Sequence, residues 1–185
     1  VGGLATAGGL AALALGLPAG LAAVIVLMLG TLATGALHED GLADCADGFW
    51  GGWTKDRRLE IMKDSHIGSY GVMALLLVTL ARWSAARAVL AAGRWPVLLA
   101  AATRVRVPMV VLMASLPNAR GSGLAASVGR PGRKQVAAAA LLALGLGCGL
   151  TGAMGAATGA GTGLAMALAT AAAGLALAWT ARVKI

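Results

Sequence analysis

Charged side chains are scarce in this chain of 185 residues, and acidic ones are absent from most of it. Only 12% of the residues are charged, about half the share of a typical soluble domain, whereas 59% are hydrophobic and the mean hydropathy is +0.83. A soluble globular protein needs far more polar surface, so the composition excludes that class. Apolar stretches of about twenty residues recur, the length that crosses a bilayer core of about 30 Å. The sequence therefore predicts an integral membrane domain.

Cysteine and histidine are also rare, and their spacing excludes the common zinc sites. Cys45 and Cys148 are the only cysteines and lie 103 positions apart, so they form no pair of metal-binding spacing. The stretch that begins with His38-Glu39 has Leu42 where a zinc protease carries its second histidine. Neither a structural zinc site nor a zinc protease is therefore expected.

The hydrophobic segments predict an all-α fold, a polytopic integral membrane helix bundle with about five to six spans. Proline should kink or divide the first segment at Pro18, because it cannot donate the helical hydrogen bond. We interpret residues 1–185 as one transmembrane domain, and as a fragment of a longer chain. The expected apolar segments are 4–37, 68–92, 97–116 and 136–181, the last long enough for two spans joined near Ala156–Gly161.

Lysine and arginine are distributed unequally over the expected loops. With alternating spans, the loops at 38–66, 118–134 and 182–185 share one side and hold ten Lys and Arg residues, whereas the opposite loops hold only Arg94. An excess of these residues marks the cytoplasmic side of a membrane protein. The polar segment 38–66 is therefore expected to face the cytoplasm.

All seven acidic residues of the chain lie between Glu39 and Asp64, where four basic residues accompany them. At about 100° per residue, a helix places Asp40, Asp44 and Asp47 within an arc of about 60° on one face. Three carboxylates so close repel one another unless a cation neutralises them, and oxygen ligands suit Mg²⁺, Mn²⁺ or Ca²⁺. A solvated acidic loop is the alternative, but it would scatter the carboxylates without helical phase. The pattern favours a Mg²⁺ site completed by substrate phosphates.

A second charged stretch, RRLEIMKDSHIGSYG at 57–71, is interpreted as the other half of the same site. A surface amphipathic helix whose charges pair, as between Glu60 and Lys63, is the alternative. Arginine is also found inside the expected spans, where it is costly and must face the bundle interior, paired with the acidic cluster or with a phosphate. These interior arginines are Arg82, Arg104 and Arg106.

Within the two charged stretches, about thirty-five contiguous residues resemble the cobalamin synthase family, also called adenosylcobinamide-GDP ribazoletransferase. The family pattern reads His-x-Asp-Gly-Leu-Ala-Asp, followed by Arg-x-Leu-Glu-Ile-Met-Lys-Asp-Ser. The loop at 116–129 is similar to a loop between later spans of the family. The residues that carry the resemblance are HEDGLAD at 38–44, ADG at 46–48, RLEIMKDS at 58–65 and Gly68.

The resemblance implies a Mg²⁺-dependent transferase in the bacterial cytoplasmic (inner) membrane. It would join adenosylcobinamide-GDP to α-ribazole, or to its 5′-phosphate, with release of GMP in the last steps of cobalamin (vitamin B12) biosynthesis. Small-molecule substrates and membrane lipid are the implied partners, nucleic acid is not, and a homo-oligomer stays open. Family members have a further span before this start and a Thr-Gly-Asp segment after this end.

The implied site combines both charged stretches. Asp40, Asp44 and Asp47 are the expected metal ligands, and either Asp64 or Asp47 is expected to take the proton from the attacking ribose hydroxyl. Glu39 stands at a position that varies in the family pattern, so it is not included. The expected substrate-binding residues are Arg57, Arg58, Lys63, His66 and Arg104.

Two other classes of membrane protein compete with this interpretation. CDP-alcohol phosphotransferases also combine spaced aspartates with Mg²⁺, but their motif Asp-Gly-x-x-Ala-Arg requires arginine where this chain has Asp44 after Ala43. A divalent-cation transporter needs carboxylates within several spans, and the expected spans contain none. Both alternatives are therefore less favoured.

Overall fold

The computed structural model describes residues 1–119, 121, 124–152, 168–176, 178–180 and 182–183. Within these ranges all regular structure is helical and there is no strand, which confirms the all-α prediction. Residues 168–176 and 178–180 are also helical. The labelled helices are α1 (Gly2–Ala14), α2 (Ala19–Ala33), α3 (Leu37–Gly51), α4 (Lys55–Ile61), α5 (Ser69–Ala91), α6 (Pro96–Arg104), α7 (Val107–Ser115), α8 (Leu124–Val128) and α9 (Arg133–Gly152).

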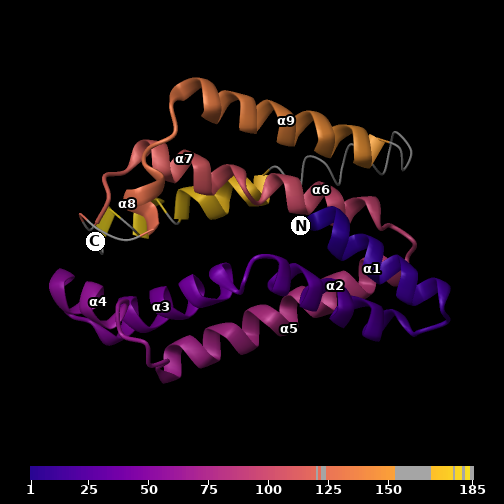
Figure 1. Ribbon diagram of the computed structural model, residues 1–185, viewed down its shortest axis with the longest axis horizontal. Coiled ribbons are helices and arrows are strands. Elements are labelled where there is room, and N and C mark those ends of the chain that lie inside the picture. Colours follow the sequence, from indigo (N-terminus) through magenta and orange to yellow (C-terminus); the bar gives the residue numbers. More distant parts are fainter. Residues whose placement is uncertain (120, 122–123, 153–167, 177, 181, 184–185) are drawn as a thin grey trace. The chain divides into compact units, whose positions relative to one another are not determined.

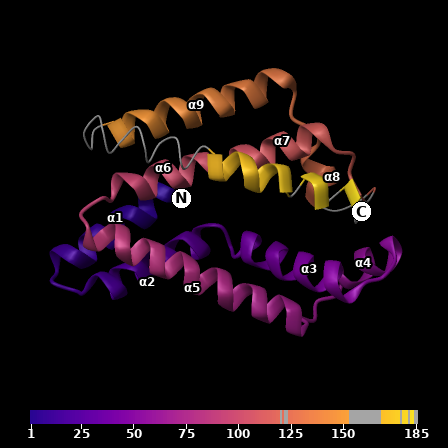
Figure 2. The ribbon, with the colours of Figure 1, turned by 180° about the vertical axis from the view of Figure 1, so that it is seen from behind.

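The helices form two compact units, Val1–Trp95 and Pro96–Val183. In the first unit α5 is the long helix against which both α2 and α3 pack, and α1 packs on α2 (Figure 1). The indole nitrogen of Trp83 in α5 donates to the Gly20 carbonyl of α2 at 2.9 Å. In the second unit α6 and α7 both pack against α9 (Figure 2).

Small side chains form the core of the first unit, whereas large apolar ones lie outside. Alanines dominate the buried positions, and small residues let membrane helices approach closely because their backbones meet without bulky contacts. Leu76, Leu77 and Leu80 of α5 are each more than half exposed. This inversion is expected of helices surrounded by lipid, where burial of leucine gains little.

Among the residues that the structure describes, three helical segments are long and apolar enough to cross a membrane: Ser69–Ala91, Pro96–Ser115 and Arg133–Leu150. Helices α2 and α3 together would make a fourth span, bent by 86°. The described residues thus support three to four spans, so the predicted five to six is supported only roughly. Helix α1 has 13 residues and is too short. The predicted junction at Ala156–Gly161 lies outside the described residues.

Two breaks in these helices have identifiable causes. Residues 15–18 separate α1 from α2, and they include Pro18, as the sequence predicted for this proline. Between α6 and α7 the helical pattern is interrupted at Val105–Arg106, because Pro108 lies in the first turn of α7, where its missing amide is tolerated. The apolar stretch predicted at 97–116 is therefore one span of two helices.

Candidate functional site

Helix α3 carries the predicted metal-binding carboxylates, so the expected helical phase is present. Asp40 is exposed, Asp44 is half-buried and Asp47 is buried, with 8% of its surface accessible. Asp40 and Asp44 are one turn apart and share a face of α3. The burial of the three aspartates therefore increases along α3, from Asp40 to Asp47.

Asp47 holds the start of α5 through both of its carboxylate oxygens. The backbone amide of Gly68 donates to Oδ2 at 2.7 Å, and that of Gly71 donates to Oδ1 at 2.9 Å. Gly68 is the N-cap of α5, so the carboxylate satisfies amides that the first turn leaves unpaired and lies at the positive end of the helix dipole. A Cβ added at either glycine would collide with these oxygens. Gly71 was not anticipated from the sequence.

Asp47 is the predicted Mg²⁺ ligand whose two oxygens both accept backbone hydrogen bonds. Among the residues that the structure describes, no group of three or more His, Cys, Asp or Glu side chains is arranged to hold a metal ion. Mg²⁺ usually takes one or two protein carboxylates and completes its coordination with water and substrate phosphates. Asp40 and Asp44 suit that kind of site. The metal assignment itself stays a prediction.

Helix α4 carries two of the predicted substrate-binding residues, Arg57 and Arg58. Arg57 forms an exposed ion pair with Glu60, with 2.7 Å between Nη1 and Oε2, so Glu60 pairs with Arg57 where the surface-helix alternative named Lys63. Arg58 donates from Nε to the Gly52 carbonyl at 2.9 Å and from Nη2 to the Trp53 carbonyl at 3.3 Å. Arg58 therefore neutralises the carboxyl end of α3, where the helix dipole is negative.

Asp64 and His66 pair with each other in the loop between α4 and α5, and Lys63 beside them is exposed. The imidazole Nδ1 lies 2.7 Å from Asp64 Oδ1, and the His66 amide donates to the same oxygen at 3.2 Å. These hydrogen bonds lower the pKa of the Asp64 carboxyl below its usual range and raise the pKa of His66 above its usual range. Asp64 is consequently ionised at neutral pH.

The Asp64→Asn variant should return the pKa of His66 to its ordinary value of about 6.5. In the wild type the charge attraction within the pair stabilises the folded loop while Asp64 is ionised and His66 is protonated. That contribution is lost as the pH rises through the raised pKa of His66, or falls through the lowered pKa of Asp64. An NMR titration of the imidazole, assigned with His66→Gln, measures the midpoint. An equal midpoint in both proteins would contradict the pairing.

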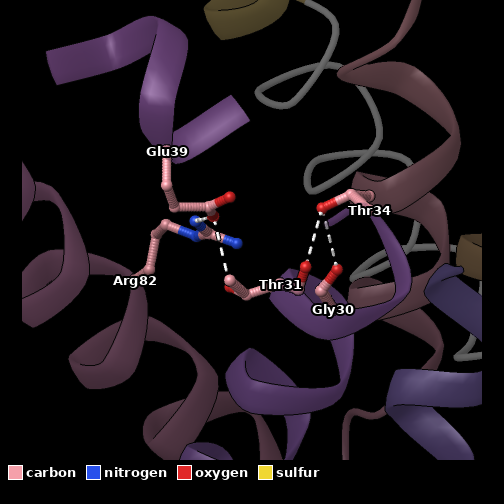
Figure 3. Close-up of polar contacts among 5 residues, drawn as sticks. All are labelled: Gly30, Thr31, Thr34, Glu39 and Arg82. Atoms are coloured by element: carbon pink, nitrogen blue, oxygen red, sulfur yellow. Dashed lines mark hydrogen bonds and ion pairs between the residues drawn. The ribbon is translucent and has the colours of Figure 1, made fainter. Parts of the chain in front are cut away.

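Glu39 was not among the predicted site residues, but its carboxylate connects α3 with α2 and α5. Its Oε1 accepts from Arg82 Nη1 of α5 at 2.7 Å and from the Thr31 hydroxyl of α2 at 3.3 Å (Figure 3). The ion pair confirms that Arg82 pairs with an acidic residue of this segment, whereas the prediction that it faces the interior is wrong, because 46% of its side chain is exposed. An arginine within an expected span requires an anionic partner, so the sequence indicated that Arg82 has one. No local pattern indicated that the partner is the carboxylate of Glu39.

Arg104 is located in the second unit, where 3% of its surface is accessible. Its Nη2 lies 3.6 Å from Cys148 Sγ of α9, and a Cβ added at Gly147 would collide with the guanidinium. Arg104 also lines a mostly apolar cavity of about 500 Å³ between α7, α9 and the described helical residues 170–175, 178 and 182. The prediction that Arg104 faces the interior is confirmed, whereas its substrate-binding role stays a prediction.

The chain matches the family described as cobalamin-5-phosphate synthase over residues 1–185. Three curated relatives bear the name adenosylcobinamide-GDP ribazoletransferase. That of Bradyrhizobium diazoefficiens is 52% identical over 130 residues, which cover 68% of this chain and 48% of the relative. That of Azorhizobium caulinodans is 46% identical over 138 residues (70% and 50%), and that of Chlorobium phaeovibrioides is 42% identical over 126 residues (67% and 51%).

The chain spans about half the length of the curated relatives it matches. No solved structure matches it. The family match includes α3, α4, the loop from α4 to α5 (residues 62–68) and the long apolar helices of both units. It agrees with the resemblance carried by residues 38–68. On these grounds the chain belongs to the cobalamin-5-phosphate synthase family.

Proposed function

We propose that the full-length protein joins adenosylcobinamide-GDP to α-ribazole, or to its 5′-phosphate, and releases GMP. The ribose hydroxyl would form a new P–O bond to the phosphorus attached to the cobinamide, while the bond from that phosphorus to the GMP oxygen breaks. The observation that carries the proposal is the family match over the whole chain, together with relatives named for this activity. The same match disfavours the CDP-alcohol phosphotransferase and cation-transporter alternatives.

Helix α3, helix α4 and the loop at residues 62–68 would supply the carboxylates and the basic side chains that this reaction needs. Asp40 and Asp44 would hold Mg²⁺ against the diphosphate, and the bound ion would neutralise charge as GMP departs. Two basic side chains would bind substrate oxygens. Lys63 is exposed beside Asp64, and Arg57 can exchange Glu60 for a phosphate. This segment would face the cytoplasm, as the distribution of Lys and Arg indicates.

Asp64 is the better candidate for the base that accepts the proton of the ribose hydroxyl. Both oxygens of Asp47 already accept backbone hydrogen bonds, and this carboxylate is buried. Asp64 is exposed and ionised, so a substrate hydroxyl can reach its carboxylate, and the hydrogen bond with His66 orients that carboxylate. Between the two residues that the sequence left open, the geometry favours Asp64.

Chelation of divalent cations should abolish GMP release by the full-length protein in lipid vesicles. Purified protein would be incubated with adenosylcobinamide-GDP and α-ribazole, with Mg²⁺ or with EDTA, and GMP quantified by chromatography. We expect GMP to form only when both substrates and Mg²⁺ are present, because the diphosphate otherwise keeps its full charge. Absence of GMP with all components, or equal release in EDTA, would contradict the proposal, and cation flux without GMP would favour a transporter.

A further inference from the structure

We propose that the ion pair of Glu39 and Arg82, with the Thr31 hydroxyl, is a positioning element for α3. It would hold the face that carries Asp40 and Asp44 in one orientation after the sharp bend from α2. This inference rests on the proposed function, because it assigns α3 the metal-binding carboxylates. Glu39 and Arg82 are positioning residues, since neither is placed against the substrate.

The bend from α2 to α3 depends on an unusual backbone. Helix α2 ends in a Schellman motif, in which the amide of Gly35 bonds to the Leu32 carbonyl at 3.1 Å and the amide of Ala36 to the Thr31 carbonyl at 2.9 Å. Gly35 and Ala36 both have positive φ, +60° and +58°. A left-handed alanine is disfavoured, so the surrounding contacts must hold the bend.

Glu39 provides the contact that crosses this bend. It lies in the first turn of α3, where a carboxylate also interacts favourably with the helix dipole, and it reaches back to Thr31 in the last turn of α2 (Figure 3). Only 18% of its side chain is exposed, and Oε2 is buried and accepts no hydrogen bond from any residue that the structure describes. A carboxylate so enclosed depends on its cationic partner, because an uncompensated buried charge is costly.

Arg82 supplies that cation from the same helix that Asp47 contacts. Gly71 and Arg82 are separated by eleven positions, about three turns, and so lie within about 20° of each other on α5. Helix α3 thus contacts one face of α5 at two places. Glu39 makes the contact near the start of α3, and Asp47 makes the contact near the end of α3. Asp40 and Asp44 lie between these two attachments. Loss of the first one would free the start of α3 to rotate about Gly35 and Ala36, carrying Asp40 with it.

The kinetic test compares Glu39→Gln, Arg82→Gln, the double variant and Arg82→Lys in the full-length protein. We expect each Gln variant to lower kcat for GMP release by up to about 10²-fold, with KM nearly unchanged, because the carboxylates are misplaced. The Mg²⁺ concentration for half-maximal rate should rise about tenfold. The double variant should be no worse than either single one, and Arg82→Lys should restore part of kcat. The matched control is Arg87→Gln, an arginine of the same helix stacked on Trp83.

The distance between α2 and α3 tests the same proposal and does not depend on GMP release. Spin labels would be attached through Leu21→Cys in α2 and Trp50→Cys in α3, both exposed positions. Cys45, Cys148 and any cysteine that the full-length protein carries outside this chain would first be replaced by serine. Double electron–electron resonance should give a narrow distribution in the parent and Arg87→Gln proteins. The distribution should broaden in the proteins that lack either member of the ion pair.

These readouts separate the positioning role from the proposed activity. An inactive parent protein would overturn the proposed function, whereas an active parent with unchanged kcat and Mg²⁺ dependence in Glu39→Gln would overturn the positioning role alone. Unchanged distance distributions in both Gln variants would overturn it as well. A fall in kcat with broadened distances and a raised Mg²⁺ requirement would support it.

Discussion

The Asp40→Ala and Asp44→Ala variants should each release GMP about 10³-fold more slowly than the wild-type full-length protein. A metal clamp on a transferring phosphoryl group contributes several kcal/mol, and each 1.4 kcal/mol is a factor of ten. Both residues lie on one face of α3, Asp40 exposed and Asp44 half-buried, so alanine leaves no large cavity and the fold should persist. Initial rates at saturating substrates, over a range of Mg²⁺ concentrations, measure the loss.

Asp56→Ala is the matched control, because Asp56 is an exposed acid in the first turn of α4 and belongs to neither predicted ligand set. We expect its rate to stay within about threefold of wild type, as surface substitutions seldom have large effects. Unaltered membrane insertion and melting temperature would show that the aspartate variants are folded. A rate near wild type for both would remove α3 from the metal site.

The sequence correctly predicted those features that depend on residues close together in the chain, such as a long span, a helical phase and a break at a proline. The span expected at 68–92 is found as α5, Ser69–Ala91, because a long apolar run bounded by polar residues has few other solutions in a bilayer. The helical phase of Asp40, Asp44 and Asp47 is likewise a property of consecutive residues. The break at Pro18 follows from the chemistry of one residue.

The contacts that shape the site could not be predicted in this way, because their partners are distant or are backbone groups. Asp47 accepts from amides 21 and 24 positions away, and an amide has no signature of its own in the sequence. Glu39 and Arg82 are 43 positions apart. The bend at Ala36 was also missed, since alanine rarely adopts a positive φ and nothing in its neighbourhood indicates one. The sequence pattern locates the carboxylates, and the tertiary contacts show that Asp47, unlike the sequence prediction, has two backbone amides as partners.

Asp47 is where the sequence and the structure suggest different roles, and the two roles predict opposite measurements. If the aspartate mainly holds α5, Asp47→Ala should destabilise the full-length protein by about 3–5 kcal/mol, since it removes two charge-assisted hydrogen bonds, one from the buried Gly71 amide and one from the partly buried Gly68 amide. The melting temperature in detergent should then fall by about 10 °C. Residual GMP release should keep the wild-type Mg²⁺ dependence.

If Asp47 instead binds the metal, the Mg²⁺ requirement should rise steeply while the melting temperature changes little. Gly71→Ala separates the two cases further, because it leaves the carboxylate in the chain but pushes a Cβ against it. Overpacking of this kind costs about 1–3 kcal/mol, so we expect a lower melting temperature. Gly30→Ala is its control, since a Cβ there meets nothing within 4 Å and α2 should gain slightly from the added methyl group. Equal melting temperatures for the Gly71 and Gly30 variants would show that the Asp47 carboxylate lies elsewhere, and a metal site of three aspartates would then become the better account of α3.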